Sequence, residues 1–215
     1  DIMRKPGAFA GLHYHNNRLH AFRDSNGLKP LFYLRARTLT AFASERKPLW
    51  RLGLRNVERV LPGHLYSVGL HALTKVRLAR MPRPSRGSMS LQEASSQLAR
   101  LLRQSIRRIT RDVDRIAVAF SGGLDSALTA HLARQVHPEV HLFSVGLSGS
   151  SELSTVEGYA QELDLPITVQ AFSADSLEES VRRVIWLIEE PNLMKVSVAI
   201  PLHWAAMTAA LGGFR

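Results

Sequence analysis

The stretch Arg115-Ile116-Ala117-Val118-Ala119-Phe120-Ser121-Gly122-Gly123-Leu124-Asp125-Ser126 decides the fold of this chain. Residues 116–120 are mostly apolar and predict a buried strand. A Ser-Gly-Gly turn follows directly, and a helical pattern then opens at Ser126. A strand, a glycine turn and a helix N-terminus together predict an anion site. Glycines allow the backbone to approach a phosphate closely, and the first amides of the helix and its dipole face the negative charge.

The side chains of this turn indicate a nucleotide site that differs from a Walker A loop. The Lys of the pattern G-x-x-x-x-G-K-[ST] is absent. The hydroxyls of Ser121 and Ser126 can donate to phosphate, and Asp125 places a carboxylate beside the expected phosphates. Because like charges repel, Asp125 is expected to hold a metal ion that bridges to phosphate oxygens. An ordinary glycine-rich turn is the alternative, and the flanking strand and helix favour nucleotide binding.

The run from Ser121 to Ser126 resembles the pyrophosphate loop of the ATP pyrophosphatases, which include asparagine synthetase, argininosuccinate synthetase and several tRNA-modifying enzymes. The resemblance implies an α/β fold with a parallel doubly wound sheet, like that of the adenine nucleotide α hydrolases. It implies cleavage of ATP between the α- and β-phosphates, with transfer of AMP to a substrate oxygen. It also implies that Asp125 is the catalytic residue and the Mg²⁺ ligand, and that the nucleotide is bound by Ser121, Gly122, Gly123, Leu124 and Ser126.

The rest of the C-terminal half alternates strand and helix patterns, which is typical of a parallel α/β sheet. Strands are predicted at 140–145 and 167–171, and helices are predicted to begin at Ser154, Asp175 and Pro201. Ligands of such sheets bind at the carboxyl ends of the strands. Val145 and Gly146 end the second strand, so the adenine is expected to lie against them.

Three further segments match the same family. Residues 143–152 are similar to the asparagine synthetase strand that takes the adenine, and residues 185–192 and 199–204 also follow the family's pattern. Glu189 and Asn192 fall where the family has acidic residues near its site. A helix terminus and turn is an equally good explanation of these two side chains.

The first half reads as short antiparallel strands, with a hairpin turn at Asn16 and Asn17. Residues 23–33, 42–49 and 61–64 are similar to the second half of the class II glutamine amidotransferase domain of asparagine synthetases, a β domain of Ntn-hydrolase type. That family hydrolyses glutamine with an N-terminal cysteine, and this chain has no cysteine. Glutaminase activity is therefore not expected, and we expect these residues to serve only as structure.

These patterns predict two domains joined by a linker. Residues 1–80 are expected to form a partial amidotransferase-like β domain, residues 81–90 a proline-containing linker, and residues 91–215 a synthetase domain. Ser90 and Glu93 form a capping box that begins an amphipathic helix. The resemblance implies that a second ATP- and metal-binding loop follows residue 215, so that the chain corresponds to the middle of a full synthetase.

The net charge of +10 is unevenly distributed. Residues 1–115 hold 23 Lys and Arg against 7 Asp and Glu, which gives +16, and residues 116–215 hold 5 against 11, which gives −6. A nucleic acid, an acidic partner or a solvated basic face would each explain this asymmetry. Nucleic acid is less favoured, because no aromatic side chains are interleaved with the arginines of the capped helix. No signal peptide and no apolar run of about 18 residues is evident, so no membrane and a cytoplasmic location are expected.

These observations predict an ATP-dependent amidoligase of asparagine synthetase type. It would adenylate a carboxylate, aspartate by family default, with Mg²⁺ and release of pyrophosphate, and the nitrogen would come from ammonia or glutamine. A tRNA-modifying relative that uses the same loop is one alternative. A degenerate module that binds nucleotide or a partner without catalysis is another. The sequence does not indicate the oligomeric state.

Overall fold

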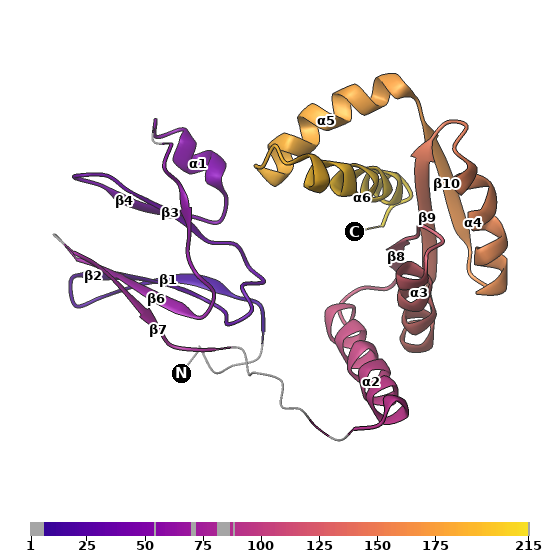
Figure 1. The fold of residues 1–215 in the computed structure, drawn as a ribbon, viewed down its shortest axis with the longest axis horizontal. Coiled ribbons are helices and arrows are strands. Elements are labelled where there is room, and N and C mark those ends of the chain that lie inside the picture. The colour runs from indigo at the N-terminus through magenta and orange to yellow at the C-terminus, as the bar shows by residue number, and fades with distance from the viewer. Residues whose placement is uncertain (1–6, 54, 70–71, 81–86, 88, 215) are drawn as a thin grey trace. The chain divides into compact units, whose positions relative to one another are not determined.

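A computed structural model describes residues 7–53, 55–69, 72–80, 87 and 89–214 (Figure 1). The chain divides into two compact units, Asp1–Arg86 and Gly87–Arg215, which we call the N-terminal and C-terminal units. The predicted linker at 81–90 falls at this division. Residues 81–86 and 88 of that linker lie outside the described residues.

The described part of the N-terminal unit holds two antiparallel sheets, with strand orders β1-β2-β6-β7 and β4-β3-β5. Apolar side chains of the first sheet and of neighbouring segments form one buried cluster, which includes Ala21, Tyr33 and Tyr66. The short helix α1 packs Leu49 against Phe32 in a second cluster. The elements of this unit are β1 (Ala10–His15), β2 (Arg18–Arg23), β3 (Phe32–Arg35), β4 (Thr40–Ala43), α1 (Arg46–Trp50), β5 (Glu58–Arg59), β6 (His64–Val68) and β7 (Leu73–Arg77).

The first hairpin confirms the sequence prediction. β1 pairs with β2 in the register His15↔Arg18, so only Asn16 and Asn17 form the turn. Both have positive φ angles, 47° and 57°, the combination that a two-residue turn of type I′ needs and that Asn tolerates. The strands β5 and β7 were not predicted. β5 has only two residues, which is too short to carry a period-two pattern.

The segment after β2 is organised by two buried charged side chains. Asp24 is 2% exposed, and its carboxylate accepts hydrogen bonds from the backbone N–H groups of Phe9, Asn26, Leu28 and Lys29. Arg23 is 4% exposed and donates to the carbonyl oxygens of residues 27, 29 and 60. Burial raises the pKa of Asp24, but the four N–H groups outweigh it and hold that pKa below its ordinary value.

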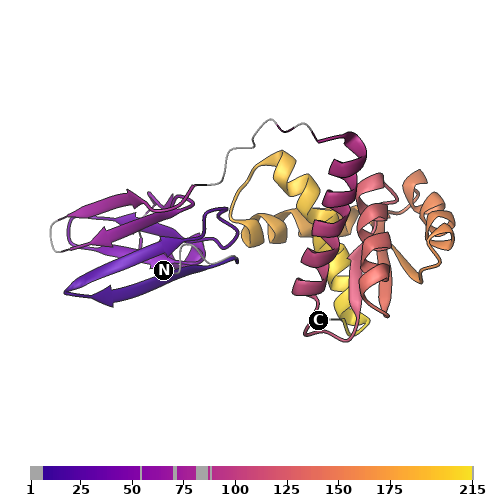
Figure 2. The ribbon, with the colours of Figure 1, turned by 90° about the horizontal axis from the view of Figure 1, so that it is seen from below.

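The C-terminal unit is a mixed α/β fold with a three-stranded parallel sheet of order β10-β9-β8. The predicted α/β class is therefore confirmed for this unit. Figure 2 shows α2 beside α3, which it contacts. The elements are α2 (Leu91–Ile109), β8 (Ile116–Ala119), α3 (Leu124–Val136), β9 (Val140–Leu147), α4 (Ser151–Glu162), β10 (Ile167–Phe172), α5 (Ala174–Ile188) and α6 (Leu193–Leu211).

Helices cover both faces of this sheet. Alternate strand residues face opposite sides, and the buried Leu142 packs with Ala130 of α3 and Val156 of α4. Its neighbour Phe143 packs on the other face with Ala205 of α6. Two helices, α3 and α4, thus lie on one face, and α6 lies on the other, across β8 and β9.

The capping box at Ser90 is confirmed, with Ser90 Oγ and Glu93 bonded reciprocally to backbone N–H groups. Three other predicted helix starts are wrong. The helix predicted from Ser154 begins at Ser151, and the one predicted from Asp175 begins at Ala174, where Ser173 is the N-cap. Ser and Thr side chains form hydrogen bonds with nearby backbone groups at many positions, in caps and in turns. The capping-box pattern alone therefore does not determine at which residue a helix begins.

The third wrong start is the largest, because α6 begins at Leu193 and carries Pro201 in its interior. α6 is also the one helix of the described residues that is long and apolar enough to cross a membrane by length and composition. Its buried side chains, such as Ile200 and Trp204, pack against α5 and the sheet, although only 28% of the apolar stretch is buried. On α5, by contrast, the side chain of Trp186 is 54% exposed.

Candidate functional site

The predicted strand, turn and helix are present in that order. β8 ends at Ala119, and α3 begins at Leu124, two residues before the predicted start at Ser126, with Gly123 as its N-cap. Gly122 has a φ of +76°, which side chains other than glycine adopt only under strain. A Cβ on Gly122 would also lie 3.1 Å from the ring of Tyr159 and 3.3 Å from a methyl group of Val156. The sharp turn therefore needs glycine here both for its backbone angle and for its packing on α4.

Two serine hydroxyls hold the turn closed. Ser121 Oγ and Ser126 Oγ are 3.1 Å apart. The Ser121 N–H donates to Ser126 Oγ, and the Gly123 N–H donates to Ser121 Oγ, each at 3.3 Å. Ser126 Oγ donates in turn to the Gly123 carbonyl oxygen at 2.9 Å. The hydroxyl oxygens thus accept from turn amides of the kind that bind phosphate oxygens.

Asp125 lies in the first turn of α3 and is exposed. Its backbone oxygen accepts from Thr129 Oγ1, while its carboxylate has no hydrogen bond or ion pair with any residue that the structure describes. Among those residues, no group of three His, Cys, Asp or Glu side chains could hold a metal ion. A single carboxylate fits Mg²⁺, which proteins bind through one or two carboxylates together with substrate phosphates and water.

The second predicted contact region lies at the end of β9. Val145 and Gly146 are half-buried, and β9 continues beyond them to Leu147. A Cβ on Gly146 would lie 3.2 Å from Leu153 and from Ser150 Oγ. Ser150 Oγ is buried and has no hydrogen-bond partner within the described part of the chain. Glycine at 146 therefore permits the close approach of α4 to the end of the strand.

One cavity of about 410 Å³ touches both predicted regions. Ser121 of the turn and Val145 of β9 line it, and so do Phe143 and residues of α6. The other predicted site residues do not line it: Gly122, Gly123, Leu124, Asp125, Ser126 and Gly146. The α6 residues at its wall, which sequence reasoning missed, are Ser197, Val198, Pro201, Leu202 and Ala205. The apolar residues before Pro201 are the sequence signal for the first half of α6. Pro is common at the first position of a helix, so the sequence predicted a helix start at Pro201 instead.

Glu189 and Asn192 do not line this cavity. Asn192 is the N-cap of α6, and its side-chain oxygen accepts from the Lys195 N–H at 3.1 Å. Glu189 ends α5 in the left-handed conformation with a φ of 58° and is 9% exposed. The helix-terminus explanation therefore accounts for Asn192 and for the backbone of Glu189.

The C-terminal unit is thus an α/β fold that carries the strand–glycine turn–helix arrangement expected from the sequence. The sequence model described as "Asparagine synthase" matches residues 97–213, and the one described as "Glutamine amidotransferase domain" matches residues 3–51. The first match covers more than half of the chain. The chain therefore belongs to the asparagine synthase family.

Individual proteins agree with this assignment. The chain is 31% identical to "Putative asparagine synthetase [glutamine-hydrolyzing] 1" of Methanocaldococcus jannaschii, over 97% of this chain and 41% of the relative. It is 25% identical to "Asparagine synthetase [glutamine-hydrolyzing] 1" of Bacillus subtilis, over 96% of this chain and 38% of the relative. The chain thus spans about two fifths of the length of these relatives. Among solved structures, an NH3-dependent NAD synthetase from Campylobacter jejuni matches 54% of this chain and 52% of its own, with 18% identity and a TM-score of 0.38.

Proposed function

We propose that this chain contains the ATP-binding part of an ATP-dependent amidoligase of asparagine synthetase type. In this proposal the enzyme transfers AMP to a carboxylate, aspartate being the first candidate, and releases pyrophosphate. An amine nitrogen, from ammonia or from glutamine, then displaces AMP to form the amide. The family assignment supports the reaction class, and the names of the relatives supply aspartate chemistry as the starting hypothesis.

The observation that carries the proposal is the shared cavity at the carboxyl end of the sheet. β8 and β9 are neighbouring parallel strands, so their carboxyl ends lie at one edge. Ser121 follows the first strand and Val145 lies near the end of the second, and both line the same cavity of about 410 Å³. Its wall is mostly apolar, which suits a nucleobase, and the glycine turn lies directly beside it.

Within this site each predicted residue has a chemical task. The amides of the turn and the first turn of α3, with Ser121 and Ser126, would bind pyrophosphate oxygens. Asp125 would hold Mg²⁺, which neutralises phosphate charge when bound. The contribution of the chain is then positioning and charge stabilisation. For anion binding, the amides of Ser121 and Gly123 would exchange their bonds to the serine hydroxyls for bonds to phosphate.

Within the 215 residues, we propose a structural role for the N-terminal unit. Its matched segment has the amidotransferase sequence pattern, but the chain holds no cysteine that could attack glutamine. The polar side chains at its centre, Arg23 and Asp24, have backbone partners and are nearly buried. The cytoplasmic location remains a prediction, and so does the expectation that nucleic acid is not the favoured partner of this chain.

The test is ATP–pyrophosphate exchange by the 215-residue chain with Mg²⁺, with and without L-aspartate. Aspartate-dependent exchange that is lost in Asp125→Ala supports the proposal. The matched control is Asp175→Ala, because Asp175 also lies in the first turn of a helix but follows β10, which β9 separates from β8 in the sheet. We expect this control to keep the exchange.

The two alternative functions give different results in the same series. ATP binding without exchange would identify a nucleotide-binding module. Binding of tRNA that weakens steeply with salt would favour the tRNA-modifying relative. Exchange that persists unchanged in Asp125→Ala would contradict the assignment of Asp125 as the metal ligand.

A further inference from the structure

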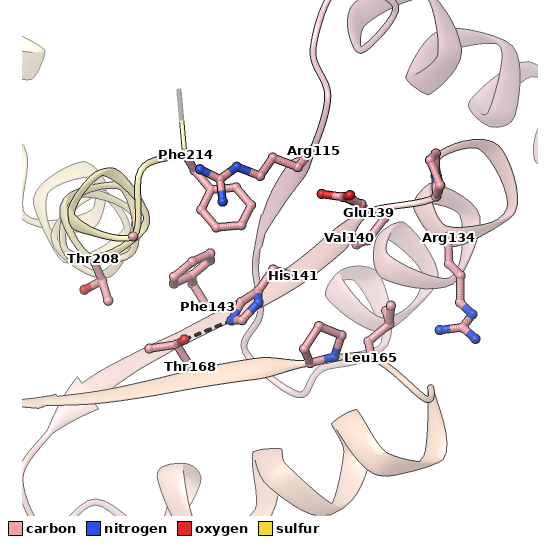
Figure 3. A pocket seen from close by; sticks show the side chains of 13 residues that line it. Arg115, Arg134, Glu139, Val140, His141, Phe143, Leu165, Thr168, Thr208 and Phe214 are labelled. Carbon is pink, nitrogen blue, oxygen red and sulfur yellow. Dashed lines mark hydrogen bonds between the residues drawn. The ribbon is translucent and has the colours of Figure 1, made fainter.

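A second cavity of the C-terminal unit, of about 620 Å³, lies at the opposite edge of the sheet from the glycine turn (Figure 3). Val140 begins β9, and Pro166 and Thr168 lie at the start of β10, so the cavity lies at the amino ends of these strands. The C-terminal end of α6 closes it with Thr208 and Phe214. Its volume falls within the range of sites for small molecules, about 300–1,000 Å³.

Three aromatic rings form one wall of this cavity. The His141 ring lies 4.8 Å from the Phe143 ring and 5.7 Å from the Phe214 ring, measured between centroids. The two phenylalanine rings lie 5.2 Å apart in an edge-on arrangement. Figure 3 shows the three rings grouped on one side of the space, beneath Arg115. Such a wall favours a planar aromatic ligand, which can stack on one ring and meet the edge of another.

The imidazole of this wall is held in place and neutral. His141 Nε2 is 2.9 Å from Thr168 Oγ1, which fixes the ring orientation. Burial lowers the pKa of His141 below its ordinary value, which favours the neutral ring. A neutral ring next to two phenylalanines can contact an aromatic ligand without the cost of desolvating a cation.

One cation at the cavity is available for an anion. The Arg115 guanidinium lies 4.5 Å from the centroid of Phe214 and donates one N–H to the Gly213 carbonyl oxygen at 2.8 Å. A guanidinium has five N–H donors, so others remain for a planar acceptor. The second arginine at the cavity, Arg134, is already paired with Asp164 at 2.5 Å. Glu139 is the acidic group at the rim, and its carboxylate points toward the same space (Figure 3).

We propose that this cavity binds a planar aromatic carboxylate, with its ring against the half-buried rings of His141 and Phe214, which the buried Phe143 supports from the core, and with its carboxylate on Arg115. A carboxylate matches the planar fork of a guanidinium, and a ring fills the apolar wall. Glu139 opposes the anion by charge repulsion and thereby limits its affinity. This site would be separate from the ATP site, because the two cavities share only Phe143 among their lining residues.

The test uses 2-naphthoate and its neutral isostere 2-naphthamide, titrated into the whole chain and followed by the NMR signals of the His141 ring and the Thr168 methyl group. We expect both signals to shift and naphthoate to bind at least about tenfold more tightly, because only its carboxylate can form charge-assisted hydrogen bonds with the guanidinium of Arg115. No shift at His141, or equal binding of the two probes, would overturn the proposal.

Single substitutions test whether the charge of Arg115 binds the carboxylate, independently of any effect on the fold. Arg115→Gln should weaken naphthoate at least about tenfold and leave naphthamide unchanged, while Arg115→Lys should restore part of the loss. Glu139→Gln should tighten naphthoate only. Arg111→Gln is the matched control, because Arg111 is an exposed arginine four residues away, ion-paired with Asp112 and absent from the cavity wall. Equal naphthoate affinity in Arg115→Gln and Arg111→Gln would contradict the assignment of Arg115, whatever the outcome of the ATP exchange assay.

Discussion

The carboxylates of Asp24 and Asp125 have opposite surroundings. Asp24 follows β2 and is 2% exposed, and its carboxylate accepts from four backbone N–H groups. Asp125 follows β8 and is exposed, and no described residue bonds to its carboxylate. The first carboxylate is fully used in holding its own loop, whereas the second is available to something outside the protein.

The backbone amides around the two aspartates differ in the same way. In the loop after β2 the amides already donate to a buried charge, so the loop has no donors to offer a ligand there. In the turn after β8 two amides donate only to the hydroxyls of Ser121 and Ser126, at 3.3 Å. Charge-assisted bonds are shorter and stronger than such neutral ones, so a phosphate can replace the hydroxyls. The comparison separates an aspartate whose carboxylate is used by its own loop from one whose carboxylate has no partner among the described residues.

The largest expected effect is on the stability of the N-terminal unit. Asp24→Ala leaves four N–H groups without their acceptor, and at about 1 kcal/mol for each bond the loss is about 4 kcal/mol. Urea unfolding followed by the NMR signal of the Trp50 indole reports this unit, because the other two tryptophans, Trp186 and Trp204, belong to the C-terminal unit. A loss below about 1 kcal/mol would show that the loop does not depend on this carboxylate.

The same substitution at the other aspartate should affect activity and spare stability. Asp125→Ala removes an exposed side chain, so the stability of the C-terminal unit should change by no more than about 0.5 kcal/mol. Mg²⁺-dependent ATP–pyrophosphate exchange should fall on the order of 100-fold, which corresponds to about 2.7 kcal/mol. Tryptophan fluorescence in urea and the exchange assay measure the two effects. A large loss of stability with full exchange activity in Asp125→Ala would show that Asp125, like Asp24, has a structural role.

The sequence predicted the turn well because its chemistry is local. The strand, the glycines and the helix are adjacent in the chain, and each has a short-range signal. The α6 wall of the cavity could not be predicted in this way. It depends on a helix that packs across β8 and β9 from about 70 residues further along the chain, and Pro201 within that helix imitates a helix start.

The sequence predicted the different roles of Asp24 and Asp125 only in part. Asp24 was placed in a family pattern, but nothing local shows that a carboxylate will meet the amide of Phe9, 15 residues earlier. The apolar face of α2 shows the same limit. Its spacing predicts a buried stripe, yet no residue of α2 is buried, and Leu91 and Ile109 are 87% and 73% exposed. Periodicity predicts which side chains share a face, and tertiary packing decides what covers it.

A smaller effect is expected from the glycine that makes the turn after β8 possible. Gly122→Ala forces a side chain into a φ of +76° and brings its Cβ within 3.1 Å of Tyr159. We expect a loss of about 1–2 kcal/mol and weaker ATP binding. The control is Gly158→Ala in α4, where no atom lies within 4 Å of the new Cβ. Because alanine favours a helix interior, this variant should gain about 0.5–1 kcal/mol. Equal effects of the two substitutions in thermal unfolding would contradict the assigned strain.

The smallest expected effect is a pH dependence confined to the N-terminal unit. The pKa of Asp24 is lowered in the folded state, despite the opposing effect of burial, because four backbone N–H groups favour its charged form. Its stabilising contribution is therefore complete above the unfolded pKa of about 3.9 and is lost as the pH falls through the folded value. Asp24→Asn has no charge to lose, so its stability deficit relative to the parent chain should shrink between about pH 5 and pH 3. Urea unfolding of both chains, followed at Trp50 across this range, measures the difference, and a constant deficit would mean that the four N–H groups do not depend on the charge of the carboxylate.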